Sequence, residues 1–238
     1  MRYSEQRQLS EAESGVDGYE RDFTQGPACA IACGAGTVYR NYFAQVNGEE
    51  GQTRFNQIDC LELIGNSLNN EELLLWKMRN GYALVCQEGL LNINAQLGKL
   101  TEIEREELKG RLKIGLQWNT EVTLSESKHK VSQAYCSALP VAYSHLDSFY
   151  WEAFTLVILE ATYEATLYAG LLNLEKTGCN KVYLTLVGGG AFGNEFEWIF
   201  ESLEKAIRKF ENTALDIVIV SYGSSNSRVR KLINEVMD

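Results

Sequence analysis

The stretch from residue 181 to residue 223 constrains the fold more than any other part of this chain. Residues 182–187 (Val-Tyr-Leu-Thr-Leu-Val) and 216–222 (Asp-Ile-Val-Ile-Val-Ser-Tyr) are apolar and rich in β-branched side chains, which predicts strands buried on both faces. Between them, apolar side chains recur at intervals of three and four from Phe196 to Phe210, which predicts a helix. This order of strand, turn, helix and strand indicates an α/β fold with parallel strands.

The turn between the first of these strands and the helix is a candidate anion site. Glycines let a backbone approach a ligand closely, and a helix N-terminus offers free N–H groups and the positive end of a dipole. Because ligands of open α/β sheets bind at the carboxyl ends of strands, we expect a phosphate or diphosphate here. The alternative is a tight turn in which the glycines are needed only for close packing and no ligand binds. The spacing matches neither the dinucleotide-binding fingerprint nor the P-loop. The turn contains Gly188, Gly189, Gly190, Ala191, Phe192, Gly193 and Asn194.

Composition narrows the class of protein. The chain has 238 residues, 45% of them hydrophobic, and a formal net charge of −10. These values predict a folded globule and argue against a nucleic-acid surface, which needs a basic face. No apolar run reaches the length of a membrane span, so we expect no membrane partner. Six scattered cysteines without a signal peptide predict free, buried thiols in a cytoplasmic protein. Cys29 and Cys33 alone do not complete a zinc site, and we expect no metal or cofactor.

The rest of the chain alternates between strand-like and helical patterns, which predicts a mostly parallel sheet with helices on both faces. Pro27 suits a first helical turn, and the small residues 28–37 would let that helix lie close to a sheet or ligand. Residues 1–21 are polar and lack periodicity, so we expect a mobile N-terminus before a single domain over residues 22–238. The further predictions are strands at 82–86, 114–124 and 131–138, helices at 88–97 and 151–174 with a left-handed cap at Gly178, and a charged, solvated segment at 102–111.

Several blocks resemble the macrodomain superfamily, whose α/β/α fold binds ADP-ribose. Residues 184–194, Trp198-Ile199 and the strand 217–220 resemble the C-terminal half of that fold. A divergent branch, linked to removal of ADP-ribose from arginine, is similar over further blocks, and together the blocks cover most of the chain from residue 17 onward. These blocks are 22–30 (Asp-Phe-Thr-Gln-Gly-Pro-Ala-Cys-Ala), 39–43 (Tyr-Arg-Asn-Tyr-Phe), 80–82 (Asn-Gly-Tyr), 118–123 (Trp-Asn-Thr-Glu-Val-Thr) and 131–140.

The resemblance implies a three-layer α/β/α fold with a mixed, largely parallel sheet, and ADP-ribose or an ADP-ribosylated protein as partner. The chain departs from the family pattern before Thr24. Only some twenty polar residues precede Thr24, and they show no pattern typical of a core strand. We therefore expect the first strands to be missing. The adenine-side acidic residue and the asparagine of the first ligand loop then have no counterpart.

The resemblance also implies roles for individual residues. The glycine turn would wrap the diphosphate, with Phe192 packing against the distal ribose. Thr24, Gln25 and Gly26 would contribute at a helix start, and Asn119 would contact a ribose. We expect the catalytic carboxylates to be Glu121 and Asp22, which would act as general base or anchor the ribose hydroxyls.

Each of these carboxylates has a structural alternative. Asp22 also suits a helix cap, and Glu121 also suits a solvated strand end. Glu195 fits a helix-dipole role better than a catalytic one. Arg40 is either a helix ion-pair partner or a diphosphate ligand.

The expected function is binding of ADP-ribose and its hydrolysis from modified protein, with the arginine linkage as first choice. The hydrolase activity itself is an expectation from the resemblance. The alternatives are a non-catalytic reader of ADP-ribose or a related nucleotide, and an inactive, truncated relative that serves as an interaction protein.

Overall fold

The structure is a computed structural model that describes residues 31–237 except residues 54, 80, 125 and 222. The expectations for residues 1–30, including a mobile N-terminus, absent first strands and the helix start at Pro27, lie outside the described residues. The chain divides into two compact units, each described here by itself. The first comprises Met1–Cys60, Met78–Tyr82 and Gly115–Cys136, and the second comprises Leu61–Lys77, Ala83–Ile114 and Ser137–Asp238.

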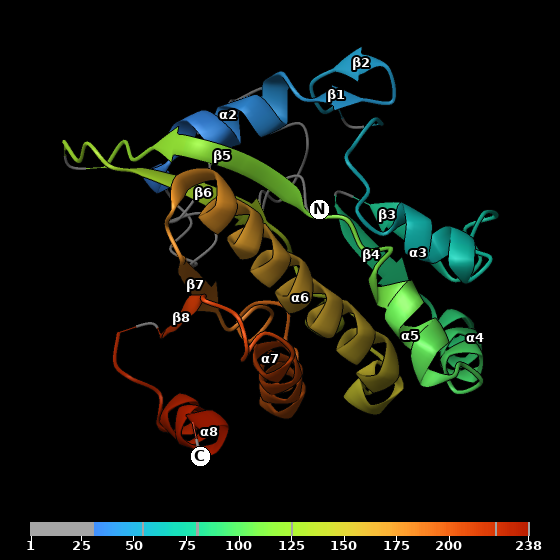
Figure 1. Ribbon diagram of the computed structural model, residues 1–238. Helices are drawn as coiled ribbons and strands as arrows, with labels where there is room; N and C mark the ends of the chain where they lie inside the picture. Colours follow the sequence, from blue (N-terminus) through green and yellow to red (C-terminus); the bar gives the residue numbers. More distant parts are fainter. Residues whose placement is uncertain (1–30, 54, 80, 125, 222, 238) are drawn as a thin grey trace. The chain divides into compact units, whose positions relative to one another are not determined.

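The described elements mix helices and strands (Figure 1), which confirms the α/β composition. The helices are α2 (Gly34–Tyr42), α3 (Glu62–Ser67), α4 (Gln87–Leu97), α5 (Glu102–Lys109), α6 (Glu152–Thr177), α7 (Phe196–Lys209) and α8 (Ser227–Met237), with 3₁₀ turns η3 (Val141–Tyr143) and η4 (Ser148–Tyr150). The strands are β1 (Gln45–Val46), β2 (Glu49–Glu50), β3 (Trp76–Arg79), β4 (Tyr82–Val85), β5 (Gly115–Glu121), β6 (Lys130–Tyr135), β7 (Lys181–Thr185) and β8 (Asp216–Val220).

Among the described residues the strands form separate two-stranded sheets. The β1–β2 and β5–β6 pairs are antiparallel, whereas β7 and β8 are parallel, with Lys181 opposite Asp216. The predicted strand–helix–strand unit is therefore confirmed. The expectation that its first strand is buried on both faces is wrong, because burial alternates along β7: Val182 and Leu184 are buried but Tyr183 is 62% exposed. Within the described part of the chain, only one face of β7 is covered by neighbouring residues. This apolar strand therefore does not lie between two layers of helices.

The first unit packs α2 against the β5–β6 hairpin. A Cβ on Gly36 would collide with the hydroxyl of Tyr135 and lie 2.8 Å from Oε1 of Gln133. The expectation that small residues allow close approach of this helix to a sheet is confirmed at this position. Thr123 fixes the start of the helix, because its backbone N–H donates to Ala32 O at 2.8 Å and its hydroxyl donates to Ile31 O at 3.1 Å.

The second unit is built around α6, the long helix of Figure 1, with α7 packed beside it. Its core contains Phe154, Leu159 and Leu167 of α6 and Ile199 and Leu203 of α7, all fully buried. The predicted helices α4, α6 and α7 are confirmed, and Gly178 ends α6 at φ 75° as expected. Trp151 and Trp198 also belong to the core and are 1% and 6% exposed.

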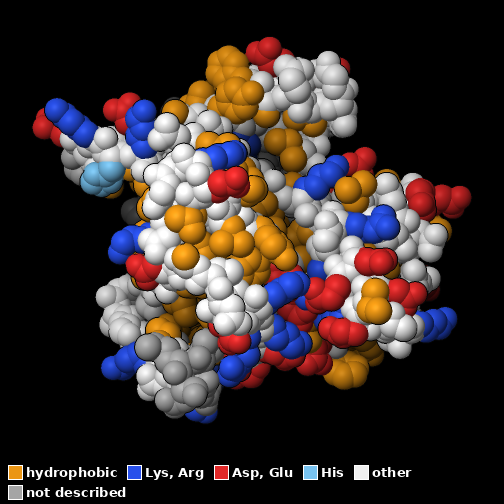
Figure 2. Space-filling view, viewed as in Figure 1, with side chains coloured by type: hydrophobic (Ala, Val, Ile, Leu, Met, Phe, Trp, Pro, Cys, Tyr) orange, Lys and Arg blue, Asp and Glu red, His pale blue; other side chains and the backbone are white. Residues whose placement is uncertain are grey.

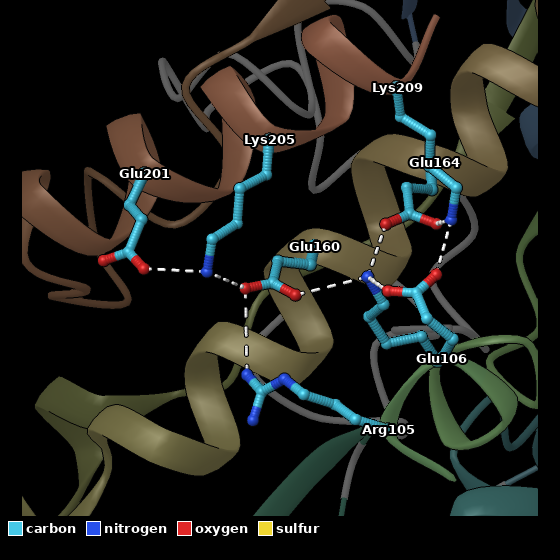
Figure 3. Close-up of polar contacts among 8 residues, drawn as sticks. Arg105, Glu106, Glu160, Glu164, Glu201, Lys205 and Lys209 are labelled. Atoms are coloured by element: carbon cyan, nitrogen blue, oxygen red, sulfur yellow. Dashed lines mark hydrogen bonds and ion pairs between the residues drawn. The ribbon is translucent and has the colours of Figure 1, made fainter. Parts of the chain in front are cut away.

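Charged side chains join α5, α6 and α7 in this unit, and Figure 3 shows them pointing toward one another between the helices. Lys109 lies at the centre, with Nζ 2.6 Å from Glu164 and 3.3 Å from Glu160, and it also pairs with Glu106. Its side chain and that of Glu160 are only 6% and 3% exposed. We expected residues 102–111 to be solvated, and this is wrong for Lys109, whose charge is neutralised by carboxylates from another helix.

The outer part of this charge cluster is more exposed. Lys209 contacts Glu106 and Glu164 at 2.6 Å each, and Lys205 contacts Glu160 at 3.0 Å. Figure 2 shows acidic and basic side chains intermingled over α6 and α7. The cluster consists of the cations Arg105, Lys109, Lys205 and Lys209 and the carboxylates Glu106, Glu160, Glu164 and Glu201.

The cluster shifts the pKa of its members in opposite directions. Burial alone would lower the pKa of the Lys109 ammonium, but hydrogen bonds to Glu106 and Glu164 and the charges of Glu164 and Glu160 outweigh burial and raise it. Burial alone would raise the pKa of Glu106, but Lys109 and Lys209 outweigh burial and lower it. The ionised forms are therefore favoured on both sides.

Of the described cysteines, none forms a disulfide. Cys33 and Cys60 are buried as expected, but Cys86 and Cys179 are exposed, so the expectation of buried thiols is wrong for these two. Cys86 is exposed because it is the N-cap of α4, where its sulfur accepts the N–H of Gly89 at 3.4 Å.

Candidate functional site

The glycine loop, residues 188–194, leaves the carboxyl end of β7 and leads to α7. Gly188 has φ +89° and Gly193 has φ +64°, both in the left-handed region. A Cβ on Gly188 would lie 2.6 Å from Cβ of Ala138 and 2.8 Å from Cγ of Asn194. By contrast, a Cβ on Gly190 would meet nothing within 4 Å. The first glycine is thus required by the fold itself, whereas Gly190 leaves open space beside the backbone.

Hydrogen bonds tie the glycine loop to η3 and to the residue Leu139 that precedes η3. The Asn194 side chain is 4% exposed, and its Nδ2 donates to Leu139 O at 2.8 Å. Its backbone N–H donates to Gly188 O at 3.1 Å, which closes the loop on itself. Near the tip, the Ala142 N–H donates to Phe192 O at 2.8 Å. The loop is held in one conformation by main-chain and amide contacts.

Backbone N–H groups of the glycine loop remain available for a ligand. Those of Gly188, Gly190 and Ala191 donate no hydrogen bond to another residue in the described part of the chain. The helix α7 begins at Phe196, and its N-cap residue, Glu195, makes no side-chain cap. Backbone N–H groups in a turn and at a helix N-terminus form the kind of concavity that binds anions.

Aromatic and charged side chains lie beside the glycine loop and the first turn of α7. Phe192 is 7% exposed and meets the edge of Tyr143 at a centroid distance of 5.7 Å. Glu197, in the first turn of α7, accepts a hydrogen bond from Arg228 of α8 at 2.8 Å. Its own backbone and Arg228 lower the pKa of the Glu197 carboxyl. The Arg228 guanidinium also lies over the ring of Phe196, 5.9 Å from its centroid.

The remaining predicted site residues belong to the first unit or lie outside the described residues. Asn119 and Glu121 belong to β5 in the first unit, and both are exposed. Asn119 has φ 55° and lies where the β5–β6 register shifts between Gln117 and Thr120. Such bulges re-aim side chains and are frequent beside functional sites. Asp22, Thr24, Gln25 and Gly26 lie outside the described residues.

Arg40 contacts an aromatic ring within the first unit. Its guanidinium lies over the ring of Tyr135, 4.8 Å from the centroid, and its Nε donates to Asn41 Oδ1 at 3.4 Å. The contact with Tyr135 is a cation–π interaction, so Arg40 helps join α2 to β6 within the first unit. His129 and His145 lie in loops.

Several residues that contact the glycine loop or its flanks were not predicted from the sequence. Leu139 and Ala142 contact the loop, Arg228 contacts the first turn of α7, and Tyr163 contacts Val187 immediately before the loop. Tyr163 lies on the buried face of α6, where a tyrosine must place its hydroxyl against a partner. The need of a buried tyrosine for a hydrogen-bond partner is the signal that could have pointed to Tyr163. It does not identify that partner.

Among the described residues, no group of His, Cys, Asp and Glu side chains is arranged to hold a metal ion. None of the helices in that part of the chain combines the length and the apolar character needed to cross a bilayer. Comparison with protein-family models, curated proteins and solved structures gave no match for this chain.

Proposed function

We propose that this protein binds ADP-ribose through the glycine loop and hydrolyses ADP-ribose from modified protein, with the arginine linkage as its first substrate. The observation that carries the proposal is the turn at residues 188–194, whose N–H groups at Gly188, Gly190 and Ala191 are unused within the described chain at the carboxyl end of a parallel strand. A diphosphate has the charge and the acceptor oxygens that such a turn binds.

The loop would act mainly through its backbone. Phe192 and Asn194 are buried and engaged within the second unit, so they would shape the loop, and the exposed N–H groups would contact the phosphates. The chain has a net charge of −10, which by itself disfavours an anion. Backbone N–H groups bind an anion without a positively charged side chain, so the loop would still hold a diphosphate.

The hydrolytic part of the proposal rests on the carboxylates. Breaking the ribose–arginine bond develops oxocarbenium-like charge at the ribose, and a carboxylate would activate water or orient the ribose hydroxyls. Glu121 and Asp22 are the proposed groups, with Asn119 as a ribose ligand. The three-layer macrodomain fold and the cytoplasmic location belong to the same proposal.

A non-catalytic reader of ADP-ribose is the second candidate. The loop offers backbone N–H groups that lie wholly within the second unit. Binding through these groups would therefore need no carboxylate, and turnover has to be tested apart from affinity.

The binding test uses Gly190, because a side chain there fits the protein. A Cβ at Gly189 would lie 3.2 Å from Cδ1 of Ile199, but one at Gly190 is unobstructed. We expect Gly190→Glu to weaken ADP-ribose binding at least about tenfold by repulsion of the diphosphate, and Gly190→Ala to fold normally as the control. Calorimetric titration measures both. Equal affinity in wild type and Gly190→Glu would place the ligand elsewhere.

The turnover test compares ADP-ribose linked through arginine, serine and glutamate. We expect Glu121→Gln or Asp22→Asn to slow release from arginine about a hundredfold or more with little change in affinity. Glu50→Gln, at an exposed position of β2, is the matched control. Binding without turnover of any linkage would favour the reader, and full activity in both variants would remove these carboxylates from the mechanism.

A further inference from the structure

Tyr163 of α6 lies at the point where β7 ends and the glycine loop begins. It is 1% exposed. Its hydroxyl is 3.0 Å from Thr185 O, to which it donates, and 3.1 Å from Val187 N, from which it accepts. The Tyr163 hydroxyl therefore forms hydrogen bonds with the last carbonyl of β7 and with an N–H group two residues later.

The two peptide groups that Tyr163 contacts flank a tight turn. Val187 N also lies 2.9 Å from Thr185 O, and Gly189 N donates to Leu186 O at 3.2 Å. The chain thus stops being a strand at Thr185 and bends twice before Gly190. Tyr163 holds the first of these bends, and so it fixes the direction in which the loop leaves β7.

The anchors of the loop come from different elements. Asn194 and Ala142 hold its far end and its tip, as described above, while Tyr163 holds its beginning. The N–H groups of Gly188, Gly190 and Ala191 lie between these anchors. The direction in which each of these N–H groups points depends on the backbone being fixed on both sides, because each residue in between has two free dihedral angles.

We infer that Tyr163 is a positioning residue, whose hydroxyl orients the glycine loop so that its free N–H groups converge on the diphosphate. This inference rests on the proposed function for the identity of the ligand, but its effect on the loop is independent of any ligand. The ring supplies packing within the core, and the hydroxyl supplies the orientation. Tyr163→Phe separates the two, because it keeps the ring.

The experiment measures amide hydrogen exchange and ADP-ribose affinity in wild type, Tyr163→Phe and Tyr168→Phe. Tyr168 is the matched control, since it lies on the same helix and is 52% exposed. We expect Tyr163→Phe to speed exchange over residues 187–194 at least about tenfold more than over residues 181–184, because the variant loses both hydrogen bonds of the hydroxyl. We also expect its affinity for ADP-ribose to fall about tenfold. Tyr168→Phe should match the wild type in both.

The outcomes separate this inference from the proposed function. Faster loop exchange in Tyr163→Phe with no ADP-ribose binding by the wild type would support the positioning role and contradict the proposed ligand. Exchange that rises equally throughout the second unit would overturn the inference, because Tyr163 would then contribute only to global stability. Unchanged loop exchange with unchanged affinity would overturn it as well.

Discussion

At Gly188 the backbone has a positive φ and leaves no space for a side chain. Only glycine meets both requirements. Its φ is +89°, and a Cβ would be 2.6 Å from the Ala138 side chain. Gly178 has a similar φ of +75°, but a Cβ there would meet nothing within 4 Å. The two glycines share a dihedral requirement and differ in crowding, so their alanine variants isolate the contribution of packing.

We expect Gly178→Ala to lower the free energy of unfolding by about 1 kcal/mol, the cost of a left-handed alanine. Gly188→Ala should lower it by about 2–4 kcal/mol, because overpacking against Ala138 and Asn194 adds to that cost. Urea denaturation followed by circular dichroism measures both values. Equal losses in the two variants would mean that the loop relaxes around the added methyl group.

At the scale of elements, the charge cluster joins three helices that are far apart in sequence. Lys109 of α5 is surrounded by Glu106, Glu160 and Glu164, and its side chain is 6% exposed. Breaking a buried ion pair by removing one partner costs more than the pair contributes, since the remaining charges stay desolvated. The position of α5 against α6 should therefore depend on this ammonium group.

We expect Lys109→Met to lower the free energy of unfolding by about 3 kcal/mol, although methionine retains most of the side-chain volume. Lys113→Met is the matched control, because Lys113 is 50% exposed and pairs with Glu62 at 3.3 Å. Its effect should stay within about 0.5 kcal/mol. Urea denaturation at low and high salt measures both. A small effect of Lys109→Met would show that Lys205, Lys209 and Arg105 compensate for it.

At the scale of the whole molecule, the charge cluster makes stability depend on pH at both extremes. The pKa of Glu106 is lowered, so its contribution is complete above about pH 4.3, the ordinary value for glutamate, and is lost as pH falls through the folded value. The pKa values of Lys109 and Lys209 are raised. Their contribution is complete below about pH 10.4 and is lost as pH rises through the folded values.

We therefore expect the unfolding free energy contributed by this cluster to be flat between about pH 5 and pH 10 and to fall outside that range. Urea denaturation from pH 7 to pH 3 tests the acid side. Glu106→Gln should reduce the acid dependence, whereas Glu102→Gln, at an exposed position of the same helix, should leave it unchanged. The same acid dependence in wild type and Glu106→Gln would contradict the assignment to Glu106.

Local pattern alone predicted much of the secondary structure. The helices α6 and α7, the parallel strands β7 and β8 and the cap at Gly178 all follow from periodicity, β-branched content and glycine chemistry. These signals are local, because the period of apolar residues records which side of an element is buried. The position of the glycine loop between strand and helix was predicted for the same reason.

Only the tertiary structure decided which polar groups are buried and what they contact. A charged helix such as α5 has the same pattern whether its Lys109 is solvated or paired with Glu164, 55 residues later. Likewise, Tyr163 is buried in the core, and its contact with Thr185 and Val187 depends on how α6 crosses the end of β7. The sequence by itself determined the elements and the loop between them, because these depend on neighbouring residues. Packing between distant elements decided the orientation of that loop and the burial of the charges that join α5, α6 and α7.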